Sequence, residues 1–147
     1  MSVLLDTSVW IAHFKQSNAA VVQLLESELV VSHEFVVAEL ACGSLKSRNE
    51  TLGYLNELVA LPTVFTREVI LLIESKVLYS RGIGLIDAHL LASTLITPGT
   101  HLWTADKRLQ KIAGELGIAY SANQQSMIGG DRGLQISPNE KEVNIVK

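Results

Sequence analysis

Cysteine is almost absent from this 147-residue sequence, which contains only Cys42. A lone cysteine forms no internal disulfide, which is typical of proteins in a reducing compartment. The sequence also lacks a basic start followed by a long apolar stretch, so it shows no secretory signal. No apolar run reaches the roughly 18 residues of a membrane span. We therefore expect a cytoplasmic protein.

Strong charge of either sign is missing as well. The 12 Lys and Arg residues against 15 Asp and Glu residues leave a net charge of −3 at pH 7. The overall charge therefore does not indicate nucleic-acid binding, and an anionic partner would need a local basic patch. Hydrophobic residues make up 48% of the chain. This excludes a disordered protein and, at this length, predicts a single globular domain.

Aromatic residues are absent after Tyr120, where the composition changes. The segment 121–147 is polar and rich in Gly, Asn and Gln. Terminal segments of this kind are commonly mobile, but "LQIS" and "VNIV" alternate as short strands do. We expect a domain over residues 1–120 and a polar tail over residues 121–147 that is flexible or packs on a neighbour.

Short apolar runs alternate with helical patterns along the first 120 residues. This alternation predicts an α/β fold in which helices pack on a parallel sheet. Ser8 and Ser32 are the expected N-caps of two helices, because a Ser hydroxyl accepts from the free amide groups of a first helical turn. Strands are expected at residues 3–5, 29–31, 101–104 and 118–120, and helices at residues 8–14, 19–28, 33–42, 49–60, 67–79, 84–95 and 107–116.

Four acidic residues stand where a solubilising charge does not belong. Asp6, Asp87 and Asp106 lie at strand ends or within apolar stretches, and Glu39 lies within "FVVAELACG". Ligands of parallel sheets bind beyond the carboxyl ends of the strands. Because Asp6 and Asp106 each follow a strand, we expect them to share that edge of the sheet.

Each acid also has a purely structural explanation. Asp6 and Asp106 can cap helices, Asp87 can interact with a helix dipole, and Glu39 can pair with a lysine. Taken together these explanations weaken, because two carboxylates about 4 Å apart repel by roughly 4 kcal/mol at an effective dielectric of about 20. A cluster of four must therefore bind cations or take up protons.

Oxygen ligands without His or Cys favour Mg²⁺ or Mn²⁺. Such an ion acidifies a bound water, which can attack a phosphodiester. The acids therefore indicate metal-assisted hydrolysis at this edge.

Four segments of the chain resemble the acidic motifs of a known family. They read "LLDTSVWI", "VVAELACG", "GLIDAHLLAS" and "LWTADKRL" in chain order. Together they are similar to the motifs of the PIN domain, and more narrowly to those of the VapC-type toxin ribonucleases of toxin–antitoxin pairs. The resemblance covers residues 3–120.

The resemblance implies a three-layer fold with a parallel sheet of about four to five strands flanked by helices. It also implies that Asp6, Glu39, Asp87 and Asp106 are catalytic residues grouped around Mg²⁺ or Mn²⁺. Asp6 and Asp87 would be metal ligands, and Glu39 and Asp106 would act directly or through water. Two hydroxyl residues would orient carboxylates or metal-bound water by hydrogen bonds: Ser8 and Thr104.

The family also implies an activity and partners. The expected activity is that of an endoribonuclease that hydrolyses RNA and leaves 5′-phosphate and 3′-hydroxyl ends. The expected partners are a second copy of the chain, in a homodimer, and a cognate antitoxin that fills the acidic groove. Lys107 and Arg108 are the best candidates for RNA phosphate contacts, because they directly follow Asp106.

Other interpretations remain open at this stage. A phosphoryl-transfer enzyme of the haloacid dehalogenase type needs a second Asp where this chain has Ser8, and a receiver-like domain needs adjacent acids that are absent. A metal-free ribonuclease would use paired histidines, but the histidines here lack paired spacing and are expected to be structural or at the surface. Trp10 and Trp103 are expected in the core or at a subunit interface. The remaining alternative is a catalytically silent PIN-like module that binds RNA or a partner protein.

Overall fold

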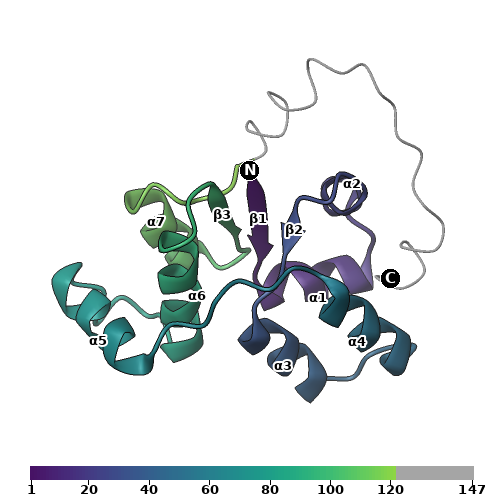
Figure 1. Cartoon of the computed structure of the whole chain (residues 1–147), viewed down its shortest axis with the longest axis horizontal. Coiled ribbons are helices and arrows are strands. Elements are labelled where there is room, and N and C mark those ends of the chain that lie inside the picture. The colour runs from purple at the N-terminus through teal and green to yellow at the C-terminus, as the bar shows by residue number, and fades with distance from the viewer. Residues whose placement is uncertain (122–147) are drawn as a thin grey trace, which may run out of the picture.

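The computed structural model of the chain describes residues 1–121. Its centre is a parallel sheet in the order β2-β1-β3, with helices on either side (Figure 1). The strands are β1 (Ser2–Leu5), β2 (Val30–Val31) and β3 (Thr100–Trp103). The α/β prediction is therefore confirmed, whereas the expectation for the tail lies almost wholly outside the described residues.

One further segment lies beside each edge strand of the sheet. Ser32, directly after β2, forms a parallel bridge with Ala60, and Leu102 in β3 forms one with Ala119. Five chain segments therefore lie side by side, in line with the expected four to five strands. The strand expected at residues 118–120 is present as this single bridge.

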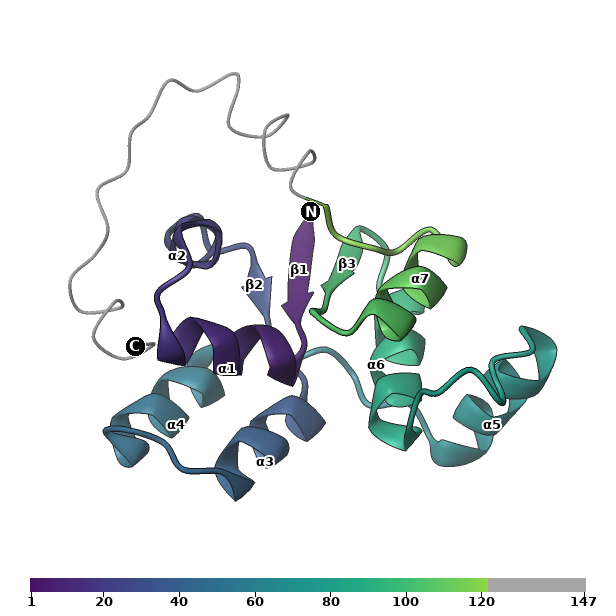
Figure 2. The same ribbon diagram turned by 180° about the vertical axis from the view of Figure 1, so that it is seen from behind.

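Seven helices surround the sheet within the described residues. α1 contacts β1 and α3, α6 contacts β3, and α5 packs mainly on α6 at the periphery of the molecule (Figures 1 and 2). They are α1 (Thr7–Lys15), α2 (Ala19–Glu26), α3 (Glu34–Cys42), α4 (Arg48–Glu57), α5 (Thr66–Ser75), α6 (Leu85–Leu95) and α7 (Lys107–Glu115). None of the helices in residues 1–121 has the length and apolarity that a membrane span requires.

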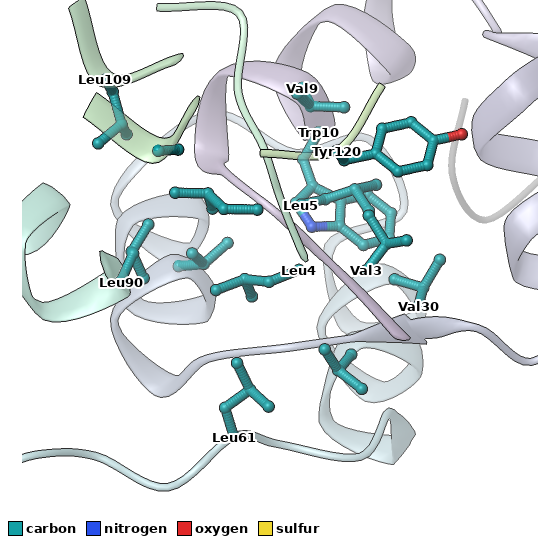
Figure 3. Packing of buried hydrophobic residues seen from close by; sticks show 14 of the residues in the cluster. Val3, Leu4, Leu5, Val9, Trp10, Val30, Leu61, Leu90, Leu109 and Tyr120 are labelled. Carbon is teal, nitrogen blue, oxygen red and sulfur yellow. The ribbon is translucent and has the colours of Figure 1, made fainter. Parts of the chain in front are cut away.

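The core forms around β1, whose apolar side chains have no exposed surface (Figure 3). Trp10 is fully buried against it, as expected for a core tryptophan, and Leu90 and Leu109 bring α6 and α7 to the same cluster. Trp103 is partly buried and packs its ring 4.9 Å from that of Tyr120. Burial at this density holds β1 rigidly, so the residue that follows it is placed accurately.

The helices α4 and α5 end at least three residues earlier than the sequence predicts, for local reasons. α4 stops at Glu57 because Ala60 leaves the helical path to pair with Ser32. α5 stops at Ser75 because Val77 adopts a left-handed backbone with φ 53°.

Both predicted serine caps are wrong. Asp6 holds the N-cap position of α1, and His33 holds that of α3. The His33 Nδ1 atom accepts from the Phe35 N–H at 3.0 Å. Each helix begins at a different residue from the one that the Ser rule selects. The Ser8 hydroxyl is therefore free for contacts outside its own helix.

Candidate active site

Asp6 stands at the carboxyl end of the central strand, as predicted. Its N–H donates to the Trp103 carbonyl oxygen at 2.9 Å, which continues the ladder between β1 and β3. Its side chain is 6% exposed and makes no capping hydrogen bond to α1. The capping explanation therefore does not account for this carboxylate.

Two hydroxyl groups hold the Asp6 carboxylate from different elements. Thr104 Oγ1 donates to Asp6 Oδ2 at 2.7 Å, and Ser8 Oγ donates to the same oxygen at 3.0 Å. Ser8 Oγ in turn accepts from the Ala105 N–H at 3.1 Å. These bonds join the start of α1 to the segment after β3 and fix the direction of the carboxylate.

Glu39 is held by a residue that the sequence analysis did not select. Thr7 Oγ1 donates to Glu39 Oε1 at 2.7 Å, from the first residue of α1 to the middle of α3. Within residues 1–121, Glu39 forms no ion pair with a lysine. The signal in the sequence was the pair of hydroxyl residues after Asp6, of which only Ser8 was assigned a role.

Asp87 and Asp106 each accept backbone hydrogen bonds at the start of a helix. Asp87 Oδ2 accepts from the Gly84 N–H at 3.2 Å in the first turn of α6. Asp106 Oδ1 caps α7 by accepting from the N–H groups of Arg108 and Leu109 at 2.8 and 3.1 Å. The structural explanations are thus correct for these two acids, which leaves open a second role for the other carboxylate oxygens.

The charges of the other three acids act on Asp87. Its pKa is raised first by burial; the hydrogen bond from Gly84 opposes this, and the negative charges of Asp6, Asp106 and Glu39 raise the pKa further. Together with Asp87, these residues come from four separate parts of the chain. None of the four carboxylates forms an ion pair within residues 1–121, so their mutual repulsion is not relieved by the described part of the chain.

The carboxylates are near one another without being in contact. In the part of the chain that the structure describes, no three His, Cys, Asp or Glu side chains form a ready-made metal cluster. Repulsion between like charges favours such a spread arrangement. The donor set itself, with oxygen ligands only, is of the kind that Mg²⁺ and Mn²⁺ take.

Basic residues lie next to the acidic edge. Lys107 and Arg108 are exposed in the first turn of α7, directly after Asp106. Arg81, just before α6, donates two hydrogen bonds to Glu115 at 2.6 and 3.0 Å. The edge thus has cationic groups beside it in spite of the negative overall charge.

The histidines do not form an alternative centre. His13, His33 and His89 are buried. His33 Nε2 lies 3.0 Å from Ser93 Oγ, and burial lowers the pKa of this imidazole. Buried imidazoles with packing and capping contacts are structural groups, as expected from the sequence.

Comparison with known proteins gives the family. The PIN domain family matches residues 3–115. Ribonuclease VapC32 of Mycobacterium tuberculosis, in each of two strains, is 42% identical over 117 residues, which are 80% of this chain and 94% of that protein. The crystal structure of PAE2754 from Pyrobaculum aerophilum has the same fold, with a TM-score of 0.58 at 16% identity over 87% of this chain and 94% of its own. The chain therefore belongs to the PIN-domain family, and within it to the VapC type.

Proposed function

We propose that this protein is an Mg²⁺- or Mn²⁺-dependent endoribonuclease and the toxin of a toxin–antitoxin pair. The observation that carries the proposal is the placement of Asp6, which is buried after β1 and held by Ser8 and Thr104. Its negative charge, with those of Glu39 and Asp106, acts on Asp87 and raises the pKa of that carboxyl beyond the effect of burial. Neighbouring carboxylates repel one another, and a bound cation relieves this repulsion. The 42% identity to a protein named a ribonuclease supports the choice of RNA as substrate.

In this proposal Asp6 and Asp87 hold the metal ion, while Glu39 and Asp106 act on it directly or through water. The bound cation would supply an acidified water for attack on the phosphodiester phosphorus. Cleavage of the P–O3′ bond leaves a 5′-phosphate and a 3′-hydroxyl. Ser8 and Thr104 act through Asp6, because their hydrogen bonds keep its carboxylate pointing in one direction.

The partners follow from the same assignment. We propose that a cognate antitoxin covers the acidic edge, where an arginine of the antitoxin would pair with the carboxylates. A hollow between α1 and the start of α4 is a separate candidate for contact with a protein partner, because it combines apolar side chains with lysines. It is lined by Ile11, Phe14, Lys15, Ser44, Leu45, Lys46 and Thr51. We also propose that the chain forms a homodimer and acts in the cytoplasm.

A second function has one observation in its favour. Asp87 and Asp106 already accept hydrogen bonds at the starts of α6 and α7, which fits a catalytically silent module that only binds RNA or a partner protein. The two functions differ in one measurable property, which is RNA cleavage that depends on a divalent cation.

Asp6→Asn is expected to reduce cleavage by more than about 100-fold, since loss of an outer partner of a metal ligand alone costs about 10- to 100-fold. The amide keeps an oxygen that accepts the bonds of Ser8 and Thr104, so the fold is retained. The measurement is cleavage of a labelled oligoribonucleotide by the purified chain with Mg²⁺ or Mn²⁺, and with EDTA. Asp131→Asn makes the same chemical change outside the residues that match the family and serves as the control.

Undiminished cleavage by the Asp6→Asn variant, or cleavage that continues in EDTA, would refute metal-dependent catalysis at this site. Binding of RNA without any cleavage by the unmodified chain would favour the silent module. Cyclic phosphate at the new ends would point to metal-free chemistry instead.

A further inference from the structure

Gly82, in the segment between α5 and α6, is covered by the side chain of Arg108. The backbone of Gly82 is left-handed, with φ +81°. A Cβ atom on Gly82 would lie 2.6 Å from Arg108 Nη1, 2.7 Å from its Cδ and 3.1 Å from its Cζ. The first two separations are shorter than real Cβ contacts allow. The Arg108 side chain therefore lies where any residue other than glycine would place its Cβ.

A second contact holds the same segment against α7. Arg81 donates two hydrogen bonds to Glu115, the last residue of α7. Arg108, in the first turn of α7, lies on Gly82. The segment is thus attached to both ends of the helix, and displacement of Arg108 leaves the Arg81–Glu115 ion pair in place.

This contact joins the segments that carry two of the acidic residues. The Arg108 N–H donates to Asp106 Oδ1 at 2.8 Å, so its backbone lies beside that carboxylate. Gly84, two residues after Gly82, donates to Asp87 at 3.2 Å. The arginine side chain therefore extends from the helix that Asp106 caps to the segment that leads into Asp87. Within the described residues, no carboxylate forms an ion pair with its guanidinium.

We propose that Gly82 is a positioning residue for RNA binding, which seats Arg108 so that its guanidinium contacts a phosphate of the RNA at the carboxylate edge. The inference rests on the proposed function, because it requires RNA as the substrate. A guanidinium held in one place loses less rotamer freedom on binding. Its planar pair of donors also matches phosphate oxygens. Because residue 82 is a glycine, the space that a Cβ atom would fill is open to the Arg108 side chain.

The chain offers a matched control for this proposal. Gly82→Ala puts a Cβ into the space of Arg108 and also places alanine in a left-handed backbone. Gly99→Ala introduces the same backbone strain, because φ is +80° there, but its Cβ would meet nothing within 4 Å. Since the atoms in conflict at position 82 belong to a flexible side chain, Arg108 moves and the fold remains, which circular dichroism verifies for each variant.

RNA binding is measured in the Asp6→Asn background with EDTA, so that the RNA is not cut. Fluorescence anisotropy of a labelled oligoribonucleotide over a series of salt concentrations gives the affinity and its salt dependence. Gly82→Ala is expected to weaken binding about tenfold, as the loss of a charged hydrogen bond does. It should also lower the slope of log K against log salt by about 0.7, the value for one phosphate contact of a single strand. Arg108→Ala should have the same two effects, and Gly99→Ala neither.

The double variant separates positioning from a general weakening. If Gly82 acts through Arg108, Gly82→Ala has no further effect on RNA binding once Arg108→Ala is present. An unchanged salt slope in Gly82→Ala, an equal loss in Gly99→Ala, or additive losses in the double variant would each overturn the inference. If the chain binds no RNA at all, both this inference and the proposed function are wrong. If cleavage depends on Asp6 but Gly82→Ala binds normally, only this inference is wrong.

Discussion

At the scale of single residues, the adjacent hydroxyl groups of Thr7 and Ser8 donate hydrogen bonds to two different carboxylates. Ser8 donates to Asp6, two residues away in sequence, whereas Thr7 donates to Glu39 on another helix. Asp6 is buried and has a second donor in Thr104. Glu39 is exposed, so the hydrogen bond from Thr7 limits the freedom of its side chain.

Thr7→Val tests this role, because it keeps the shape of the side chain and removes the donor. We expect cleavage to fall about 10- to 100-fold, as it does when the outer partner of a metal ligand is lost. We also expect the Mn²⁺ concentration needed for half-maximal cleavage to rise, while Thr7→Ser, which keeps the hydroxyl, stays close to the unmodified chain. Thermal unfolding in EDTA is the control for stability. Equal loss of activity in both variants, or an unshifted Mn²⁺ midpoint in Thr7→Val, would contradict the role.

At the scale of elements, three helices end with the same backbone hydrogen bond but with different residues in the left-handed position. The N–H groups of Leu29, Leu78 and Ile118 reach back to the carbonyl oxygens of Leu24, Ile73 and Ala113 at 3.0, 2.9 and 2.9 Å. This pattern requires a left-handed residue just before the donor, a position that favours glycine. The left-handed residues are Glu28 after α2, Val77 after α5 and Gly117 after α7, so only α7 is followed by a glycine at this position.

Glu28→Gly is expected to stabilise the fold by about 1 kcal/mol, since left-handed backbone costs an ordinary residue roughly 1–2 kcal/mol. Glu28 is exposed with φ 56°, so little packing is lost. Gly117→Ala should have the opposite effect, because its Cβ would meet nothing within 4 Å and only the backbone cost remains. Urea denaturation of both variants measures the change. A fall in the free energy of unfolding for Glu28→Gly would show that the glutamate side chain makes a compensating contact.

At the scale of the whole molecule, exposed apolar side chains are concentrated at the end that α5 forms. Of the ten large hydrophobic residues exposed in the described part of the chain, six lie between residues 65 and 85: Phe65, Ile70, Leu71, Val77, Tyr79 and Leu85. We call this set the α5 surface. Monomeric proteins rarely expose many large apolar side chains in one region, and a twofold interface needs one self-complementary surface. The α5 surface is therefore our candidate for the homodimer contact.

Leu71→Glu is expected to convert the dimer to a monomer, because it places a charge on the α5 surface that an interface would have to bury. Leu71 is 67% exposed, so the folded monomer tolerates the change. Light scattering coupled to size-exclusion chromatography gives the mass. Val59→Glu, at a residue 73% exposed outside the α5 surface, is the control. A monomeric unmodified chain, or dissociation by Val59→Glu, would rule this surface out.

The sequence by itself determined the class of the fold and the position of the acids along it. Strand and helix patterns are local, so the runs around residues 3–5 and 85–95 could be recognised without knowledge of their neighbours. Asp6 after a buried strand likewise indicated an edge site, because strand direction and strand end are both visible in sequence. Helix starts were less predictable, since Asp6 and His33 took the cap positions assigned to Ser8 and Ser32.

Only the tertiary structure decided which hydroxyl group holds which acid. Thr7 meets Glu39 across 32 positions, and Thr104 meets Asp6 across 98. The contact of the Arg108 side chain with Gly82 likewise joins two segments that no local sequence pattern relates. Such pairs depend on how α1, α3 and the segment after β3 pack around one sheet edge. Packing is a property of the whole chain, so the acids and the supporting roles of Ser8 and Thr104 could be predicted from the motifs, whereas the pairing of Thr7 with Glu39 could not.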